Sequence, residues 1–325
     1  MDTTTLVKSV TNGILSIAIS LFSCSKDHDL PDAQKLPEQI TFSSTSLYPE
    51  SFGYDSLSKL FVVGSIKHGT LGTVDVKGKY TPLPSDPSWI STFGIKVVGS
   101  FAYVSIGDLG NSLKSSTSTA TKVAKIVKYD LANKKVVQTY DLAQLFNGAI
   151  FPNDLALDDQ NNIYVTESLT GFIYKIDGGG NKSIFLKNDA FKGEGFNLNG
   201  ITFDNRGFLL VDKTNEGKLF KITISDKSVT TVHLSSPITG SDGLFLNGQS
   251  LYIVNYISGI VTELKTTDNW ISANVASEYA TEIGSSAVTL AEGTIYILNA
   301  RVTEIVTDPG RALSDTYTIT KFKGK

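Results

Sequence analysis

The chain has few of the residues that carry thiol and soft-metal chemistry. It contains one cysteine, Cys24, and three histidines, His28, His68 and His233. A single cysteine cannot form a disulfide within the chain. The small set also disfavours a zinc site of the Cys/His type and a cysteine nucleophile served by a histidine. We therefore expect the chemistry to depend on carboxylates, amides, hydroxyls or a hard cation.

Long runs of basic residues are absent as well, and the formal net charge is −3. The chain lacks the electrostatic footprint of a protein that binds nucleic acid or an anionic membrane surface, and we expect neither partner. Hydrophobic residues make up 41% of the 325 residues and charged residues 19%. This balance indicates a globular protein with a large core.

The N-terminal segment has the form of an export signal. Residues 13–23 are an apolar run too short to span a bilayer, with Lys8 before it and Cys24 directly after it. The segment LFSC at 21–24 resembles a bacterial lipobox, which predicts a lipoprotein anchored at Cys24 on the periplasmic or cell-surface face of the cell envelope. Without lipidation, the same segment predicts a secreted protein. We assign residues 1–40 to a leader and tether, and residues 41–325 to the folded domain.

A repeat of about 44 residues organises the folded domain. The segments 151–177, 197–223 and 240–265 align with one another, and further copies lie at 47–75, 91–105 and 285–299. Their short strands are rich in Val, Ile, Tyr and Phe, and Asp/Asn/Gly clusters separate them. This pattern predicts an all-β fold, a six-bladed β-propeller of four-stranded blades. We expect a strand at 40–44 to pair with one at 316–322 and close the ring.

One position recurs at the head of the first strand of every unit. It is occupied in turn by Glu50, Phe93, Asn153, Asn199, Asp242 and Ser286. The inner strands of a propeller surround one axis, so we expect these six side chains to converge there. The Gly/Ser/Thr-rich segment 107–122 lengthens the second unit and predicts a long loop, either a solvated spacer or a substrate lid.

Four of the six converging side chains carry oxygen donors, namely Glu50, Asn153, Asn199 and Asp242. Two carboxylates and two amides suit Ca²⁺, which takes six to eight oxygen ligands in flexible geometry. Zn²⁺, Mn²⁺ and Mg²⁺ are alternatives. Asn-Gly and Asp-Gly pairs are common in turns, so each motif alone is weak. Their shared repeat phase favours a metal site.

The motifs YPES (Glu50), FPND (Asn153), LNG (Asn199) and SDG (Asp242) resemble the SMP-30/gluconolactonase/LRE family of six-bladed propellers, in the same order and phase. The resemblance covers nearly the whole mature chain. It implies a metal-dependent hydrolase in which Asp242 is the acid/base and Asn153 is shared between metal and substrate. Phe151 stands where sugar-lactonase members carry an Arg. This departure disfavours a sugar lactone and favours a less polar lactone or ester.

Other polar residues at strand ends are candidates for contacts around the metal or the substrate. Asp154 either orients the metal ligands from behind or serves as a turn residue at the start of a strand. Glu167, Asn255 and Asn299 either line the cleft or lie on its solvated rim. We expect Tyr256 to form an apolar wall.

The sequence thus predicts a monomeric, calcium-dependent lactonase or esterase of the cell envelope that acts on a small-molecule lactone or ester. The cation would polarise the carbonyl and activate a water, whose proton Asp242 accepts. Two alternatives stay open. One is a calcium-stabilised propeller that binds a ligand or a partner without turnover, and the other is a phosphotriesterase.

Overall fold

The computed structural model of the chain describes residues 36–308, 310 and 313–324. Cys24 and the other residues of the expected leader up to residue 35 lie outside the described residues. Within the described ranges, no helix is long and apolar enough to cross a membrane. The residues from Leu36 onward form one compact unit.

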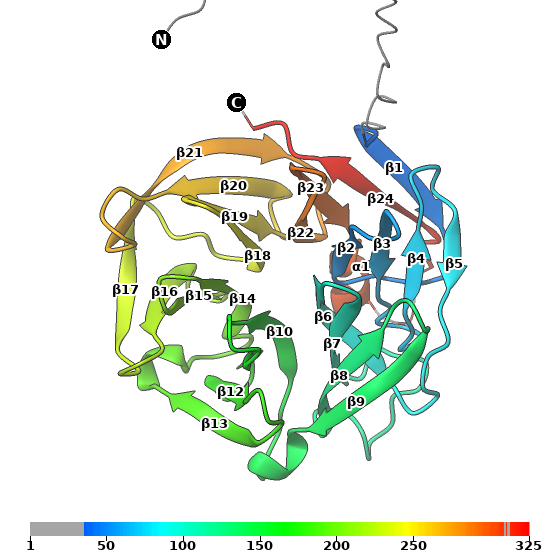
Figure 1. The fold of residues 1–325 in the computed structure, drawn as a ribbon, viewed down its shortest axis with the longest axis horizontal. Helices are drawn as coiled ribbons and strands as arrows, with labels where there is room; N and C mark the ends of the chain where they lie inside the picture. The colour runs from blue at the N-terminus through cyan, green and yellow to red at the C-terminus, as the bar shows by residue number, and fades with distance from the viewer. Residues whose placement is uncertain (1–35, 309, 311–312, 325) are drawn as a thin grey trace, which may run out of the picture. The chain divides into compact units, whose positions relative to one another are not determined.

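The unit is an all-β propeller, in which antiparallel sheets surround a central axis (Figure 1). The first sheet contains β2 (Phe52–Asp55), β3 (Leu60–Val63), β4 (Gly72–Val74) and β5 (Tyr80–Pro82). The second contains β6 (Ser91–Val98), β7 (Phe101–Gly107), β8 (Ala124–Asp130) and β9 (Lys135–Asp141). The third contains β10 (Pro152–Leu157), β11 (Ile163–Glu167), β12 (Phe172–Ile176) and β13 (Lys182–Lys187). In each sheet the first strand lies nearest the axis.

The next part of the chain forms one eight-stranded sheet. Its first half contains β14 (Leu198–Asp204), β15 (Phe208–Lys213), β16 (Lys218–Thr223) and β17 (Val229–Leu234). Its second half contains β18 (Ser241–Asn247), β19 (Ser250–Asn255), β20 (Ile260–Lys265) and β21 (Ser272–Ala280). Each half is antiparallel, and the halves join through parallel pairing of His233 with Ser272 and Leu234 with Ala273. The expected propeller is confirmed, but two of the six expected sheets are hydrogen-bonded into one.

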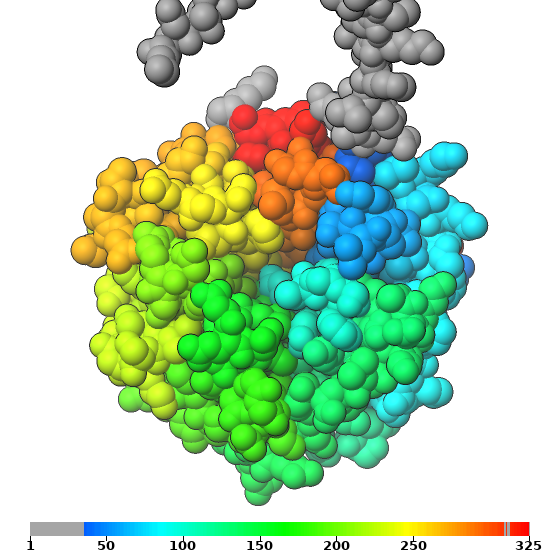
Figure 2. Space-filling view, in the orientation of Figure 1, coloured from blue at the N-terminus to red at the C-terminus, as the bar shows by residue number. Residues whose placement is uncertain are grey.

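The ring closes through a sheet made from both ends of the described chain. It contains β1 (Gln39–Ser43), β24 (Thr316–Lys321), β23 (Thr294–Asn299) and β22 (Ser285–Ala291), in that order. Ile40 pairs with Ile319 in the β1–β24 ladder. Figure 2 accordingly shows blue N-terminal atoms beside orange and red C-terminal ones. The closure expected between 40–44 and 316–322 is confirmed.

Within residues 36–308, 310 and 313–324, helical structure is confined to short segments. These are the 3₁₀ turns η1 (Ala143–Leu145) and η2 (Asp189–Phe191), and the helix α1 (Val302–Thr307). Apolar side chains fill the space between neighbouring sheets, as where Val62 of β3 packs in one cluster with Val104 of β7 and Val127 of β8. The packed sheets hold the inner strands in fixed positions around the axis.

A β-bulge lies at the head of most inner strands. The register shifts between Pro152 and Leu155 in β10, and equivalent shifts occur in β6, β14, β18 and β22. A bulge leaves a residue out of the ladder and redirects its side chain. Asn153 falls in the β10 bulge, as Asn199 and Asp242 fall in those of β14 and β18. The bulges therefore aim the recurring side chains away from the ladder.

The glycines of the Asn-Gly and Asp-Gly pairs have a packing role. A Cβ on Gly200 would lie 2.4 Å from the carbonyl oxygen of Asp242, and one on Gly243 would lie 2.6 Å from that of Ser286. Neither glycine has a positive φ, and both lie within strands. The alternative that these pairs are ordinary turns is therefore wrong, because their glycines allow neighbouring inner strands to approach closely.

We expect Gly200→Ala to lower the free energy of unfolding by about 1–3 kcal/mol, because the new methyl group meets backbone that cannot move aside. Gly179→Ala is the matched control. Its Cβ would come no closer than 3.3 Å to a side-chain oxygen of Asp177 in an exposed turn. Urea unfolding followed by circular dichroism measures both variants. Equal stability of the two would contradict this account of the inner strands.

Candidate functional site

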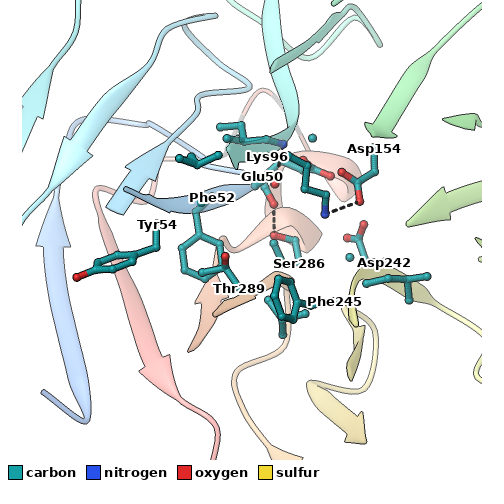
Figure 3. A pocket seen from close by; sticks show the side chains of 18 of the residues that line it. Glu50, Phe52, Tyr54, Lys96, Asp154, Asp242, Phe245, Ser286 and Thr289 are labelled. Carbon is teal, nitrogen blue, oxygen red and sulfur yellow. Dashed lines mark hydrogen bonds and ion pairs between the residues drawn. The ribbon is translucent and has the colours of Figure 1, made fainter. Parts of the chain in front are cut away.

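The structure brings the four predicted metal ligands together. A cavity of about 70 Å³ is lined by Glu50, Asn153, Asn199 and Asp242. Phe93, the recurring residue of the second unit, lines the same cavity. Ser286, the recurring residue of the last unit, does not line this cavity. Its hydroxyl donates a hydrogen bond to the carbonyl oxygen of Glu50 (Figure 3).

The donor atoms at this position are buried and unpaired. Among the described residues, Glu50 Oε2, Asn153 Oδ1 and Asn199 Oδ1 have no hydrogen-bond partner. The amide orientation of Asn153 is fixed, because its Nδ2 donates to Ser168 Oγ at 3.0 Å and Ser168 donates on to the carbonyl oxygen of Leu198 at 2.6 Å. Buried oxygens without partners are costly, and a cation that accepts several oxygen ligands removes this cost. The residues present therefore fit a hard divalent cation.

Within the described ranges, no group of three or more His, Cys, Asp or Glu side chains is placed to hold a metal ion. The candidate set differs in kind, because it combines two carboxylates with two amide oxygens. Such a mixed oxygen set suits Ca²⁺ better than it suits zinc, which prefers nitrogen and sulfur ligands.

The electrostatics of the site favour binding of positive charge. Burial raises the pKa of Glu50 well above its usual range, and the charges of Asp242 and Asp154 raise it further, while Lys96 lowers it. Burial likewise raises the pKa of Asp242 to about 8. A side-chain hydrogen bond from Asn199 opposes that shift, and the charge of Asp154 adds to it. Crowded, desolvated carboxylates of this kind take up either protons or a cation.

A second cavity of about 270 Å³ adjoins the site on the channel side. Its lining shares Glu50, Asn199 and Asp242 with the first cavity and adds Asp154 and Lys96. Asp154 Oδ2 forms an ion pair with Lys96 Nζ at 3.3 Å, as Figure 3 shows. Asp154 thus lies behind the candidate ligands, consistent with an orienting role, and not at a turn.

An apolar wall faces the candidate ligands across the smaller cavity. The ring of Phe151 meets that of Phe93 edge to face with centroids 4.5 Å apart, and that of Phe196 at 6.1 Å. Further apolar lining comes from four other parts of the chain: Ile66, Leu109, Tyr256, and Val302, Ile305 and Val306 of α1. Tyr256 therefore forms part of the expected apolar wall.

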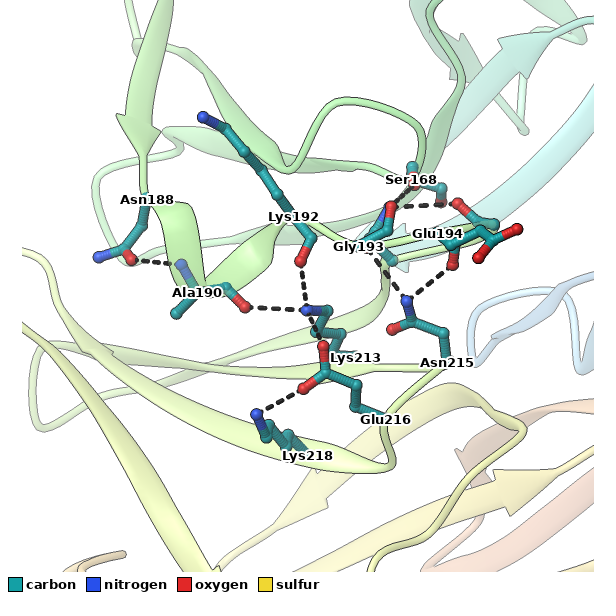
Figure 4. Close-up of polar contacts among 12 residues, drawn as sticks. Ser168, Asn188, Ala190, Lys192, Gly193, Glu194, Lys213, Asn215, Glu216 and Lys218 are labelled. Atoms are coloured by element: carbon teal, nitrogen blue, oxygen red, sulfur yellow. Dashed lines mark hydrogen bonds and ion pairs between the residues drawn. The ribbon is translucent and has the colours of Figure 1, made fainter.

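The loop that carries Phe196 is fastened to β15 by Lys213, a buried lysine. Lys213 Nζ donates to the carbonyl oxygens of Ala190 at 3.1 Å and Lys192 at 2.7 Å, and pairs with Glu216 (Figure 4). Because these contacts surround the segment that leads from η2 to Phe196, they hold this part of the wall in place.

The long loop 107–122 also contributes to the wall, through Leu109 and Asn111. Asp108 accepts hydrogen bonds from the Gly110 N–H at 2.7 Å and from Ser115 Oγ at 2.6 Å. Ser112 Oγ donates to carbonyl oxygens of neighbouring loops. These hydrogen bonds hold the loop against its neighbours, and the loop forms one side of the cleft.

Three of the other candidate residues lie outside the lining of both cavities. The carboxylate of Glu167 accepts the N–H groups of Phe151 at 2.7 Å and Leu169 at 3.0 Å, so it fixes the turn after β11. Asn255 accepts the Ser258 N–H at 3.0 Å and likewise holds a turn. Asn299 is buried, and its amide has no hydrogen-bond partner among the described residues.

Two charged residues escaped the sequence analysis. Lys96 lies in the channel, and Asp212 of β15 is buried beside Ser241. Burial raises the pKa of Asp212 well above its usual range, the neighbouring Ser241 side chain lowers it, and the charges of Asp242 and Asp154 raise it. Lys96 is the single charge of the apolar stretch GIKVV, and Asp212 follows the apolar run FLLV directly, beside Lys213. That pattern is the signal by which they could have been found.

No family model matches the sequence, and no curated protein matches it. Solved structures do match. The allergen Mala s 1 of Malassezia sympodialis is 17% identical with a TM-score of 0.70, covering 89% of this chain and 96% of its own. Luciferin-regenerating enzyme is 11% identical with a TM-score of 0.62, covering 88% and 97%. The calcium-binding protein regucalcin of Agrobacterium tumefaciens is 14% identical with a TM-score of 0.61, covering 89% and 96%. At these identities the likeness establishes a shared fold, and the resemblance to the SMP-30/gluconolactonase/LRE family is confirmed at that level.

In protein freed of cations, we expect the free energy of unfolding to fall as the pH rises from about 4 to about 8. The pKa of Asp242 is raised from 3.8 to about 8, first by burial. At intermediate pH the folded protein therefore keeps a proton that the unfolded chain has released. The stabilisation is complete below the pKa of the unfolded chain, and it is lost as the pH rises through the pKa of the folded protein. Asp242→Asn cannot ionise, so its fall should be smaller by roughly 2 kcal/mol or more. Urea unfolding in chelator from pH 4 to 9 measures the difference, and superimposable profiles would contradict it.

Proposed function

We propose that the protein is a metal-dependent hydrolase that opens a lactone or a related ester, with Ca²⁺ held by Glu50, Asn153, Asn199 and Asp242. The observation that carries this proposal is the set of three buried, unpaired ligand oxygens in one cavity. The proposal counts the two halves of the eight-stranded sheet as two blades, which makes the propeller six-bladed.

The chemistry that a divalent cation supplies at such a site is polarisation of a carbonyl oxygen and activation of water. Asp242 is the candidate general base, because its carboxylate lines the cleft and would be held ionised beside a bound cation. Neither described histidine competes for this role. His68 Nε2 bonds the carbonyl oxygen of Thr45 at 3.0 Å, and His233 is exposed on the outer strand β17.

The lining of the cleft supports an apolar substrate. Phe93, Phe151 and Phe196 form a continuous aromatic wall, and no Lys or Arg lines this cavity among the described residues. A sugar lactone presents several hydroxyl groups, and those that face the three rings would lose their water without gaining partners on that side. The wall therefore favours a lactone or ester with an aliphatic or aryl group, and it excludes water from the carbonyl side.

We also propose that the protein is a monomer anchored in the cell envelope through Cys24. The anchor is proposed from the sequence of the leader alone.

To test the catalytic proposal, aliphatic and aryl lactones, aryl esters and organophosphates would be assayed with Ca²⁺ and with EDTA. We expect hydrolysis of lactones or esters that EDTA abolishes, and an Asp242→Asn variant at least about 100-fold lower in kcat/KM. Asp226→Asn, in an exposed turn, is the control. Activity on organophosphates alone would identify a phosphotriesterase. Activity on none, with Ca²⁺ still raising the Tm, would identify a binding propeller.

Replacing Phe196 tests the assignment of the wall. Phe196 is partly exposed at the cleft, so Phe196→Ala should fold, and we expect it to raise KM for aryl lactones about tenfold through lost aromatic contact. The increase in Tm on addition of Ca²⁺ should not change. Phe101→Ala, a partly exposed aromatic on β7 outside the cleft, is the matched control. An unchanged KM in the Phe196 variant would place the substrate elsewhere.

A further inference from the structure

The second unit contributes a positively charged side chain, Lys96, to the channel, where the other units contribute oxygen atoms or small residues. Its recurring residue, Phe93, offers no ligand atom, but Lys96 follows three residues later on β6. The side chain of Lys96 lines the 270 Å³ cavity together with Glu50, Asp154 and Asp242. It is the one Lys or Arg in that lining among the described residues. Its side chain is 24% exposed, and that of Asp154 is 9% exposed.

Asp154 breaks the pattern of the inner strands in a way that matches Lys96. The position after the recurring residue is small in the other five units, where it is Ser51, Gly94, Gly200, Gly243 and Ala287. Close approach explains the small residues, because a Cβ on Gly94 would lie 2.6 Å from Asp154 Oδ1. Gly94 thus leaves room for a charged side chain in the third unit, and that side chain reaches Lys96 Nζ at 3.3 Å.

The four charged side chains that line the 270 Å³ cavity balance one divalent ion when its binding displaces their protons. Glu50, Asp154 and Asp242, all ionised with a cation bound, would carry three negative charges, and Lys96 carries one positive charge, which leaves a charge of −2. One divalent cation cancels this remainder. Without Lys96, the same channel would hold three carboxylates with no fixed counter-charge. One divalent cation would then leave a net charge of −1, and its binding would be stronger than in the presence of Lys96.

We propose that Lys96 is a built-in counter-ion of the cation site, which limits its affinity for Ca²⁺ by cancelling the charge of Asp154. The inference rests on the proposed cation site. Lys96 acts through Asp154 and the field in the channel, and touches no reacting atom. It is therefore a positioning residue, whose effect appears in binding and stability before it appears in turnover.

The experiment is a charge cycle read by calorimetric titration with Ca²⁺. Lys96→Met leaves −3 in the channel, the wild type −2, Asp154→Asn −1, and the double variant −2. We expect Ca²⁺ to bind Lys96→Met at least about tenfold more tightly than wild type and Asp154→Asn at least about tenfold more weakly. The double variant should bind within about threefold of wild type. Lys182→Met, an exposed lysine on β13, is the control and should leave the Kd unchanged.

A second readout is the Tm in chelator, where Lys96→Met should lie below wild type because three carboxylates lose their counter-charge. Wild-type binding with the same Kd in all variants would overturn the role of Lys96 and leave the cation site intact. Absence of Ca²⁺ binding from every variant would overturn the cation site and this inference together. If Lys96→Met does not fold, Asp154→Asn and the double variant decide. They differ only at residue 96, so recovery of the wild-type Kd in the double variant shows that the charge of Lys96 weakens Ca²⁺ binding.

Discussion

Buried oxygens of Glu50, Asn153 and Asn199 lie at the centre of the propeller, where no hydrogen-bond donor of the described residues reaches them. The strands that surround them approach so closely that Gly200 and Gly243 have no room for a side chain. The fold therefore maintains a costly group of atoms in a rigid setting. A bound cation would remove this cost, since it would supply a partner to each of these oxygens.

Much of the architecture could be predicted from the sequence because a propeller repeats its local pattern. The phase of the repeat predicted that Asn153 and Asp242 share one cavity, and the strand patterns at 40–44 and 316–322 predicted the β1–β24 closure. The joining of β17 to β21 could not be predicted, since it depends on two residue pairs between outer strands. Repeat phase also says nothing about α1, whose Ile305 reaches the cleft from a segment outside the repeat.

The polar residues show where sequence reasoning ends. Glu167 and Asn255 looked like cleft residues because they end strands, but backbone N–H groups in the following turns occupy their oxygens. Lys96 and Asp212 were overlooked because each lies in an apolar strand, where a buried charge is costly unless it has a partner. A charge in such a place is informative, and both residues lie around the cation site. Proteins of different named roles share this fold, so the function has to be argued from the site itself, here from the aromatic wall and the charges of the channel.

The central claim is that one cation is bound by the four convergent side chains. Crystals of the protein grown with Ca²⁺ and measured at a wavelength that gives calcium an anomalous signal test it most directly. The account predicts one peak on the axis, about 2.3–2.6 Å from oxygens of Glu50, Asn153, Asn199 and Asp242. An axis without a peak at millimolar Ca²⁺, with these oxygens bonded to water alone, would contradict it.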